Sequence, residues 1–155
     1  MDTDAVANVR RALIAAGAPD TVAVLDAEVP TAAAAAAALG CDVGAITNSL
    51  VFDLEGAPLL ILASGAARVD LGKVAGQAGG GRIRRADPAF VLQHTGQRVG
   101  GVAPVGHPEK IRTLLDESLK NHQLLWAGAG DHHSMFSISY NELRRITGAE
   151  EMPVR

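Results

Sequence analysis

Aromatic residues, cysteine and long apolar runs are all scarce in this sequence of 155 residues. Phenylalanine, tyrosine and tryptophan together make up 3% of it, which argues against an RNA-binding surface that stacks many bases on rings. The one cysteine, Cys41, cannot form an internal disulfide, so the disulfide-rich secreted class is excluded and a reducing compartment is favoured. Charge-free stretches such as residues 56–67 are shorter than the roughly 20 apolar residues of a membrane helix.

The amino terminus lacks the features of a secretory signal. Met1 to Asp4 is acidic and no apolar segment follows, so we expect a cytoplasmic protein with no membrane partner. With 48% hydrophobic and 20% charged residues, the composition predicts one domain over residues 1–155. A chain of this size buries roughly two-thirds of its unfolded surface, so it needs neither a disulfide nor a structural metal.

Positive charge is concentrated in the middle of the chain, although the formal net charge is −3. Residues 66–100 carry a net charge of +4, residues 1–65 carry −6 and residues 101–155 carry −1. A local positive patch suits a salt-sensitive contact with the phosphate backbone of RNA. A solvated face of arginines explains the same pattern equally well.

Hydrophobic spacing and capping residues predict five helices. The first covers residues 4–16, where Val6, Val9 and Leu13 recur at helical spacing before Gly17. The next covers the alanine run 32–38, between a Thr31 cap and Gly40. The other three are residues 70–78, ended by glycines 79–81, a helix opened by Asp87 and Pro88, and a closing helix from the capping box at Ser139 to Gly148.

Seven short segments have the pattern of strands. Residues 46–54 and 58–64 are separated by Glu55-Gly56 and predict an antiparallel hairpin. The others are 21–26, 82–85, 111–115 and 123–127 around a polar turn, and 135–138 as the last strand. Residues 98–107 are expected to form a Gly/Pro loop, and residues 150–155 a frayed tail. Strands and helices that interleave this irregularly predict an α/β fold with a mixed sheet, and argue against a doubly wound parallel sheet.

The usual cofactor and metal motifs are incomplete. Gly128 and Gly130 begin a dinucleotide fingerprint, but His133 stands where its third glycine belongs. Gly72-Lys73 lacks the upstream glycine and the following Ser or Thr of a P-loop. Asp131-His132-His133 is the one histidine cluster, and adjacent residues of an extended chain face opposite ways. We therefore predict no cofactor and no metal.

No side chain stands out as a covalent nucleophile. None of the serines lies in a Gly-x-Ser-x-Gly elbow, and Cys41 follows a helix end, where the dipole does not lower a thiol pKa. The loop from Gly100 to Gly106 remains. Its glycines allow a ligand to approach the backbone closely and Pro104 stiffens it, so its N–H groups could be aimed at a carbonyl oxygen or a water. The same composition also fits an ordinary turn.

At this loop the sequence resembles the YbaK/EbsC family, the free-standing relatives of the editing domain inserted in bacterial prolyl-tRNA synthetases. The similarity covers about residues 20–145 and is carried by motifs spread in order along the chain. They are Thr31-Ala32, Ala35, Ala36 and Leu39-Gly40, Ile46 and Ser49-Leu50-Val51-Phe52, Arg68, Asp70 and Leu71, Ala86-Asp87-Pro88, Thr95-Gly96, Gly100-Gly101-Val102 and Pro104, Asp116-Glu117-Ser118, Ala127-Gly128-Ala129-Gly130 and His133-Ser134.

The resemblance implies a mixed, barrel-like curled β-sheet surrounded by short helices, with the core of the domain at about residues 20–148. It also implies an aminoacyl-tRNA deacylase that acts in trans on mischarged tRNA, foremost tRNA(Pro), with prolyl-tRNA synthetase as a possible partner and no role for DNA. The backbone amides of a Gly-x-x-x-Pro loop would hold the acyl carbonyl, which gives Gly100, Gly101, Val102, Ala103 and Pro104 as catalytic residues. The substrate-binding residues would be Asn48, Ser49, Arg68, His133 and Ser134.

One position departs from the family pattern. Many members have a lysine immediately before the Ser-Leu-Val-Phe stretch, whereas this chain has Asn48. An amide can form hydrogen bonds but supplies no charge, so the substitution predicts either a changed specificity or a weakened activity. Two alternatives to the enzyme therefore stay open. One is a non-catalytic module of the same fold that binds tRNA or a synthetase, and the other is a small-molecule-binding protein unrelated to RNA.

Overall fold

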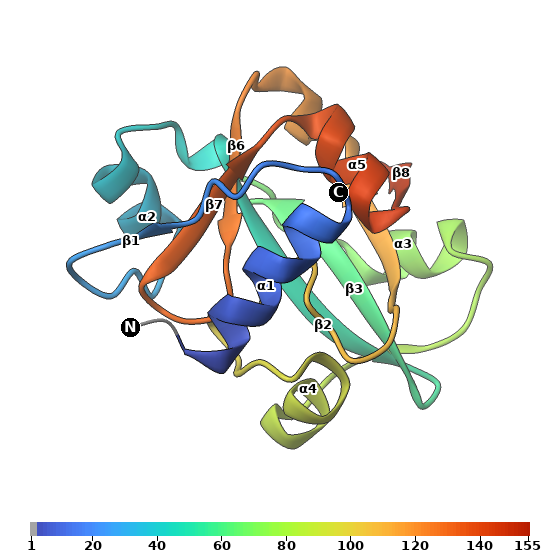
Figure 1. Cartoon of the computed structure of the whole chain (residues 1–155). Coiled ribbons are helices and arrows are strands. Elements are labelled where there is room, and N and C mark those ends of the chain that lie inside the picture. Colours follow the sequence, from blue (N-terminus) through green and yellow to red (C-terminus); the bar gives the residue numbers. More distant parts are fainter. Residues whose placement is uncertain (1–2) are drawn as a thin grey trace.

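The computed structural model describes residues 3–155, and eight strands in this part of the chain form one mixed sheet (Figure 1). The strands are β1 Ala23–Val24, β2 Ile46–Leu54, β3 Ala57–Ser64, β4 Ile83–Arg85, β5 Arg112–Asp116, β6 Leu125–Gly128, β7 Ser134–Ile138 and β8 Glu150–Met152. Their order is β1-β7-β6-β2-β3-β5-β8, and β4 pairs with β2 outside that path. The pairs β2–β6, β3–β5 and β5–β8 are parallel and the rest are antiparallel, which confirms the predicted mixed sheet.

The central hairpin of the sheet follows directly from its turn residues. Glu55 and Gly56 have φ angles of 51° and 93°, and positive φ at both central residues is the signature of a two-residue turn that matches strand twist. The register pairs Leu54 with Ala57 and runs to Thr47 opposite Ser64. Leucines and isoleucine of β3 are completely buried, so this strand is the centre of the core.

The helices begin and end where their capping residues predict. They are α1 Asp4–Ala15, α2 Ala32–Leu39, α3 Leu71–Gln77, α4 Pro88–Thr95 and α5 Tyr140–Thr147, with short 3₁₀ segments at Val43–Ala45 and Glu117–Asn121. The side chains of Thr31, Asp87 and Ser139 each accept a backbone N–H of the first turn of their helix. Glycines in the left-handed conformation close α2, α4 and α5.

The structure corrects two predictions, the extent of the first strand and the frayed tail. The expected strand 21–26 is reduced to two residues of β1, because its pairing with β7 covers only Ala23 and Val24. The expected frayed tail contains β8, which pairs in parallel with β5, and Met152 and Val154 are buried against α3 and β3. The polar turn after β5 is a 3₁₀ segment that leads to β6, three strands away in the sheet.

Both faces of the sheet carry apolar clusters. On one face, Val9 and Leu13 of α1 pack with Leu60, Leu125 and Phe136, and α1 crosses in front of β2 and β3 (Figure 1). On the other face α3 covers the side of β3 that carries Leu59 and Ile61. Between residues 3 and 155, no helix is both long and apolar enough to cross a bilayer.

Candidate active site

A break in strand pairing on one edge of β2 forms the base of the site. The β3 edge of β2 is paired from Thr47 to Leu54. On the opposite edge β6 pairs with Ile46 and Thr47 only, and β4 pairs with Phe52 to Leu54 only. Residues 48–51 therefore have no neighbouring strand on that edge, so part of their backbone polar groups is left for another partner.

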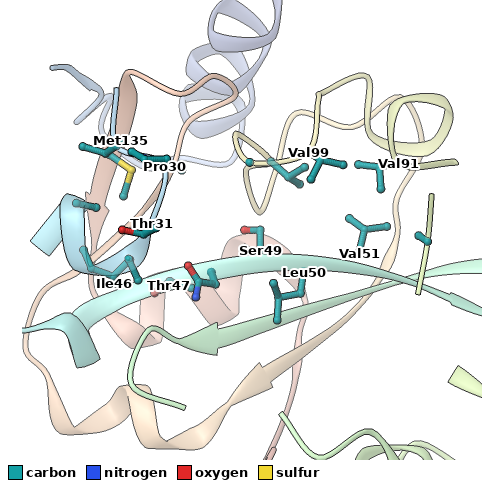
Figure 2. Close-up of a pocket in the computed structure, with 18 of the residues that line it drawn as sticks. Pro30, Thr31, Ile46, Thr47, Ser49, Leu50, Val51, Val91, Val99 and Met135 are labelled. Carbon is teal, nitrogen blue, oxygen red and sulfur yellow. The ribbon is translucent and has the colours of Figure 1, made fainter. Parts of the chain in front are cut away.

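A pocket of about 420 Å³ lies over this break. Figure 2 shows it between two apolar walls: Pro30, Thr31 and Met135 lie on one side, and Val51, Val91 and Val99 lie on the other. Ser49 lies between the walls, and Leu50 points to the opposite side of the strand. Among the residues that line the pocket, Arg85 is the one with a charged side chain.

Two hydroxyl groups in the pocket lining are buried without a hydrogen-bond partner. They are Oγ1 of Thr47 and Oγ of Ser49. Within residues 3–155, these two are the buried side-chain polar atoms that lack a hydrogen-bond partner. The residues are two positions apart in β2, so both side chains lie on the same face of the strand. A buried unpartnered polar group costs roughly 1–3 kcal/mol. Two of them in one pocket indicate a place where a ligand or an ordered water is hydrogen-bonded.

The Gly/Pro loop borders the same pocket. Some of its backbone N–H groups already have a hydrogen-bond partner, and others have none. The N–H of Gly101 donates to Arg98 O at 3.1 Å, and the N–H of Ala103 donates to Gln97 Oε1 at 2.6 Å. Pro104 has no N–H. Neither the N–H of Gly100 nor that of Val102 has a partner in the described part of the chain, and both residues line the pocket.

The loop needs glycine because it packs closely on the β6–β7 turn. Gly100 has a φ of +93°, and a Cβ there would lie 2.9 Å from Nε2 of His132. A Cβ on Gly101 would lie 2.8–3.0 Å from three backbone atoms of Asp131. The contacts with the Asp131 backbone force the chain to move when a side chain is added at Gly101, and the positive φ disfavours a side chain at Gly100. A larger residue at either position would therefore disturb the loop beside the pocket.

The site residues predicted from the sequence fall into two groups, those in or directly behind the pocket lining and those away from it. Asn48, Ser49, Gly100 and Val102 all line the pocket, although Asn48 and Ser49 lie on opposite faces of β2. Gly101, Ala103 and Pro104 are buried behind the pocket surface.

The remaining predicted residues lie outside the pocket lining. Arg68 is exposed on the segment that leads to α3. Burial opposes ionisation of Asp131, but the backbone N–H of His133 and the hydroxyl of Ser134 lower its pKa, so both residues support the β6–β7 turn. The imidazole of His133 lies 3.8 Å from the carboxylate of Glu28.

Sequence reasoning missed Thr47, Gln97 and Arg85. Thr47 is 2% exposed, and its significance lies in an absent partner, which a sequence does not reveal. Gln97 is 1% exposed and holds the loop. Arg85 belongs to the basic segment that the charge count identified, and its place at the pocket follows from the pairing of β4 with β2.

Cys41 is not an activated nucleophile, because burial and the neighbouring Asp42 carboxylate raise the pKa of its thiol. No group of three or more histidine, cysteine, aspartate or glutamate side chains within residues 3–155 is arranged to hold a metal ion. The chemistry that the pocket offers therefore consists of neutral hydrogen-bond donors and acceptors with one arginine at its edge.

This fold and pocket place the protein in a known class. Residues 26–146 match the aminoacyl-tRNA editing domain, and the chain belongs to that family. The match includes β2, the loop and the β6–β7 turn, which are the elements that build the pocket. The family connects the protein with tRNA editing.

Individual relatives agree with this placement. A candidate trans-editing enzyme for prolyl-tRNA synthetase has a similar structure, with a TM-score of 0.94 and 37% identity over 100% of this chain and 99% of that one. The hypothetical protein APE2540 is similar with a TM-score of 0.85 and 28% identity over 95% and 98% of the two chains. The uncharacterized protein YwhH of Bacillus subtilis is 34% identical over 73% of this chain and 72% of its own length.

Proposed function

We propose that this protein is a trans-acting deacylase that hydrolyses the ester bond of mischarged aminoacyl-tRNA, with tRNA(Pro) as its tRNA. The observation that carries the proposal is the pocket over the break in β2, whose lining includes two residues with unpartnered hydroxyls and two loop residues with free N–H groups. The editing-domain family supports the reaction, and the similar candidate trans-editing enzyme for prolyl-tRNA synthetase supports the choice of tRNA.

The proposed mechanism uses the loop backbone in place of a covalent nucleophile. The N–H groups of Gly100 and Val102 bind the ester carbonyl oxygen, which gains negative charge as a water attacks the carbonyl carbon. The tetrahedral intermediate then collapses, the bond to the ribose oxygen breaks, and that oxygen takes the proton lost by the water. The products are the free amino acid and a tRNA with its terminal hydroxyl restored. Each preorganised donor of this kind contributes about 3 kcal/mol to transition-state stabilisation.

The pocket selects the acyl group by size and by hydrogen bonding. Its apolar walls offer no acidic side chain to a cationic substituent, and its volume of about 420 Å³ suits a small aminoacyl group and part of the terminal adenosine. Steric selection is worth only about 1–3 kcal/mol per methylene, so such an enzyme complements a synthetase that confuses close analogues.

Basic residues beside the pocket suit the acceptor end of tRNA. Arg84 and Arg85 are exposed on β4, and neither forms an ion pair in the described part of the chain. Arg85 reaches the pocket lining. Phosphates of the single-stranded terminus can therefore be bound while the aminoacyl group occupies the pocket, and affinity should fall steeply as salt rises.

The proposal is tested with tRNA(Pro) charged separately with alanine, cysteine, serine or threonine, and with correctly charged prolyl-tRNA(Pro). Wild-type protein is expected to release at least one of the four misacylated amino acids faster than buffer and to spare the prolyl ester. Gly101→Ala, which crowds the Asp131 backbone, is expected to lower turnover by roughly 100-fold through displacement of the loop. Gly76→Ala on α3 has open space around its Cβ and is the matched control.

The alternatives give different results in the same assay. A salt-sensitive shift of tRNA in a gel without hydrolysis of any ester would identify a non-catalytic binding module, for which Asn48 in place of lysine would be the cause. Absence of both hydrolysis and binding at low salt would favour a small-molecule-binding protein. Asn48→Lys, run on the same panel, separates a changed amino-acid preference from a lost activity.

A further inference from the structure

One buried glutamine holds the candidate loop from the inside. Gln97 is 1% exposed, although a glutamine in a Gly/Pro-rich segment is ordinarily solvated. Its Oε1 accepts the N–H of Ala103 at 2.6 Å, and its Nε2 donates to Val105 O at 3.1 Å. The oxygen and the nitrogen of one side-chain amide thus bond to the two residues that flank Pro104.

Gln97 is in turn anchored to the pocket wall. Its backbone N–H donates to Oγ1 of Thr95 at 3.0 Å. The Thr95 hydroxyl donates to Val91 O at 2.7 Å, inside helix α4. Val91 lines the pocket, so a continuous set of hydrogen bonds runs from the pocket wall through Thr95 and Gln97 to the loop.

We infer that Gln97 is a positioning residue for ester hydrolysis, an inference that rests on the proposed function. By accepting the Ala103 N–H and donating to Val105 O, the side chain fixes the path of residues 100–105. The N–H groups of Gly100 and Val102 then stay unpaired at the pocket surface. Donors that are fixed before substrate binds contribute to the transition state without reorganisation. Gln97 itself does not line the pocket and touches no substrate.

Two substitutions test this role. Gln97→Leu removes both hydrogen bonds at similar volume, and Gln97→Glu keeps the acceptor but loses the donor when ionised. Both are expected to lower kcat for the best misacylated tRNA by roughly 10- to 100-fold, because donor misplacement affects the transition state. KM should stay within about twofold, because the pocket lining is unchanged. Gln93→Leu, on an exposed position of α4, is the matched control and should retain the wild-type kcat.

The glutamate variant adds a readout that a purely structural role would not produce. A protonated carboxylic acid accepts the Ala103 N–H and also donates to Val105 O, as the amide does. Burial raises the pKa of a carboxyl group at such a position. The ratio of the variant's kcat to that of wild type, measured at the same pH, should therefore rise towards one as the pH falls. His107, whose Nε2–H donates to Ala103 O, titrates in wild type as well, so the wild-type pH profile is the reference for its contribution.

The outcomes separate this inference from the proposed function. If wild type hydrolyses a misacylated tRNA while Gln97→Leu and Gln97→Glu keep kcat within about twofold of it, the inference fails and the function stands. A kcat ratio for Gln97→Glu that is low at every pH also overturns the inference. This second variant decides the matter if Gln97→Leu does not fold. A wild-type protein without deacylation removes the proposed function and the inference together.

Discussion

At the scale of single residues, the pocket is marked by polar groups that the fold leaves without partners. Thr47 and Ser49 bury hydroxyls that bond to nothing within residues 3–155. Thr113 is similarly buried in β5, but its hydroxyl donates to Ile111 O at 2.9 Å. The two threonines have the same chemistry and similar burial, and only the one in the pocket is unsatisfied. This contrast separates a binding role from a structural one.

The contrast gives a prediction for stability and activity together. Thr47→Val removes a hydroxyl that has no hydrogen bond to lose, so the free energy of unfolding should stay the same or rise, while deacylation falls. Thr113→Val breaks a buried hydrogen bond and should cost about 1 kcal/mol of stability, with turnover per folded molecule unchanged. Urea denaturation and the deacylation assay measure the two effects. A Thr47→Val protein that is destabilised as much as Thr113→Val, with full activity, would assign Thr47 to structure alone.

At the scale of elements, the features set by local sequence signals could be predicted, whereas those set by long-range strand pairing could not. Caps such as Thr31 and Ser139, and the Glu55-Gly56 turn, act over a few residues, so helix ends and the hairpin could be predicted from sequence. Strand β8 could not be predicted from sequence, because Glu150 and Glu151 are charged and the strand forms only by pairing with β5, which is distant in the sequence. The break in β2 pairing depends on where β6 and β4 end, and the site depends on that break.

The unexpected strand β8 is predicted to stabilise the fold through its apolar residue. Met152 is 8% exposed and packs in the cluster under α3, so Met152→Ala should lower the free energy of unfolding by about 2 kcal/mol. Glu150 makes two hydrogen bonds with Arg112, but both side chains are largely exposed, so Glu150→Ala should cost less than about 1 kcal/mol. Urea midpoints compare the two variants. An equal loss for both would mean that β8 stabilises by charge rather than by burial.

At the scale of the whole molecule, the groups with shifted pKa values that titrate between neutral and acid pH act in one direction. Burial lowers the pKa of His107, with partial opposition from its hydrogen bond to Ala103 O. Burial opposes ionisation of Asp20, but Arg10 holds its pKa below the ordinary value. Hydrogen bonds from Arg112 lower the pKa of Glu150. In each case the unfolded chain binds the proton more readily, so acid favours unfolding.

Acid should therefore reduce stability in two steps. The folded pKa of His107 lies below its unfolded value near 6.5, so its contribution is complete above about pH 6.5 and is lost as the pH falls towards the folded pKa. The carboxylates add a second loss below about pH 4.5. Urea denaturation from about pH 7.5 to about pH 5, a range that spans the ordinary histidine pKa, should show the first loss in wild type. A His107→Gln variant should show a flatter profile there, and an unchanged slope would contradict the assignment.

The proposed mechanism depends most on which loop amides face the substrate. The direct measurement is the ¹⁵N–¹H NMR spectrum of the protein with an aminoacyl-adenosine analogue whose ester is replaced by a stable amide. The largest shifts are predicted at the N–H groups of Gly100 and Val102, which have no partner within residues 3–155, with small changes at Gly101 and Ala103, whose N–H groups are already bonded. Saturable binding that leaves the Gly100 and Val102 resonances unmoved would contradict the proposed mechanism.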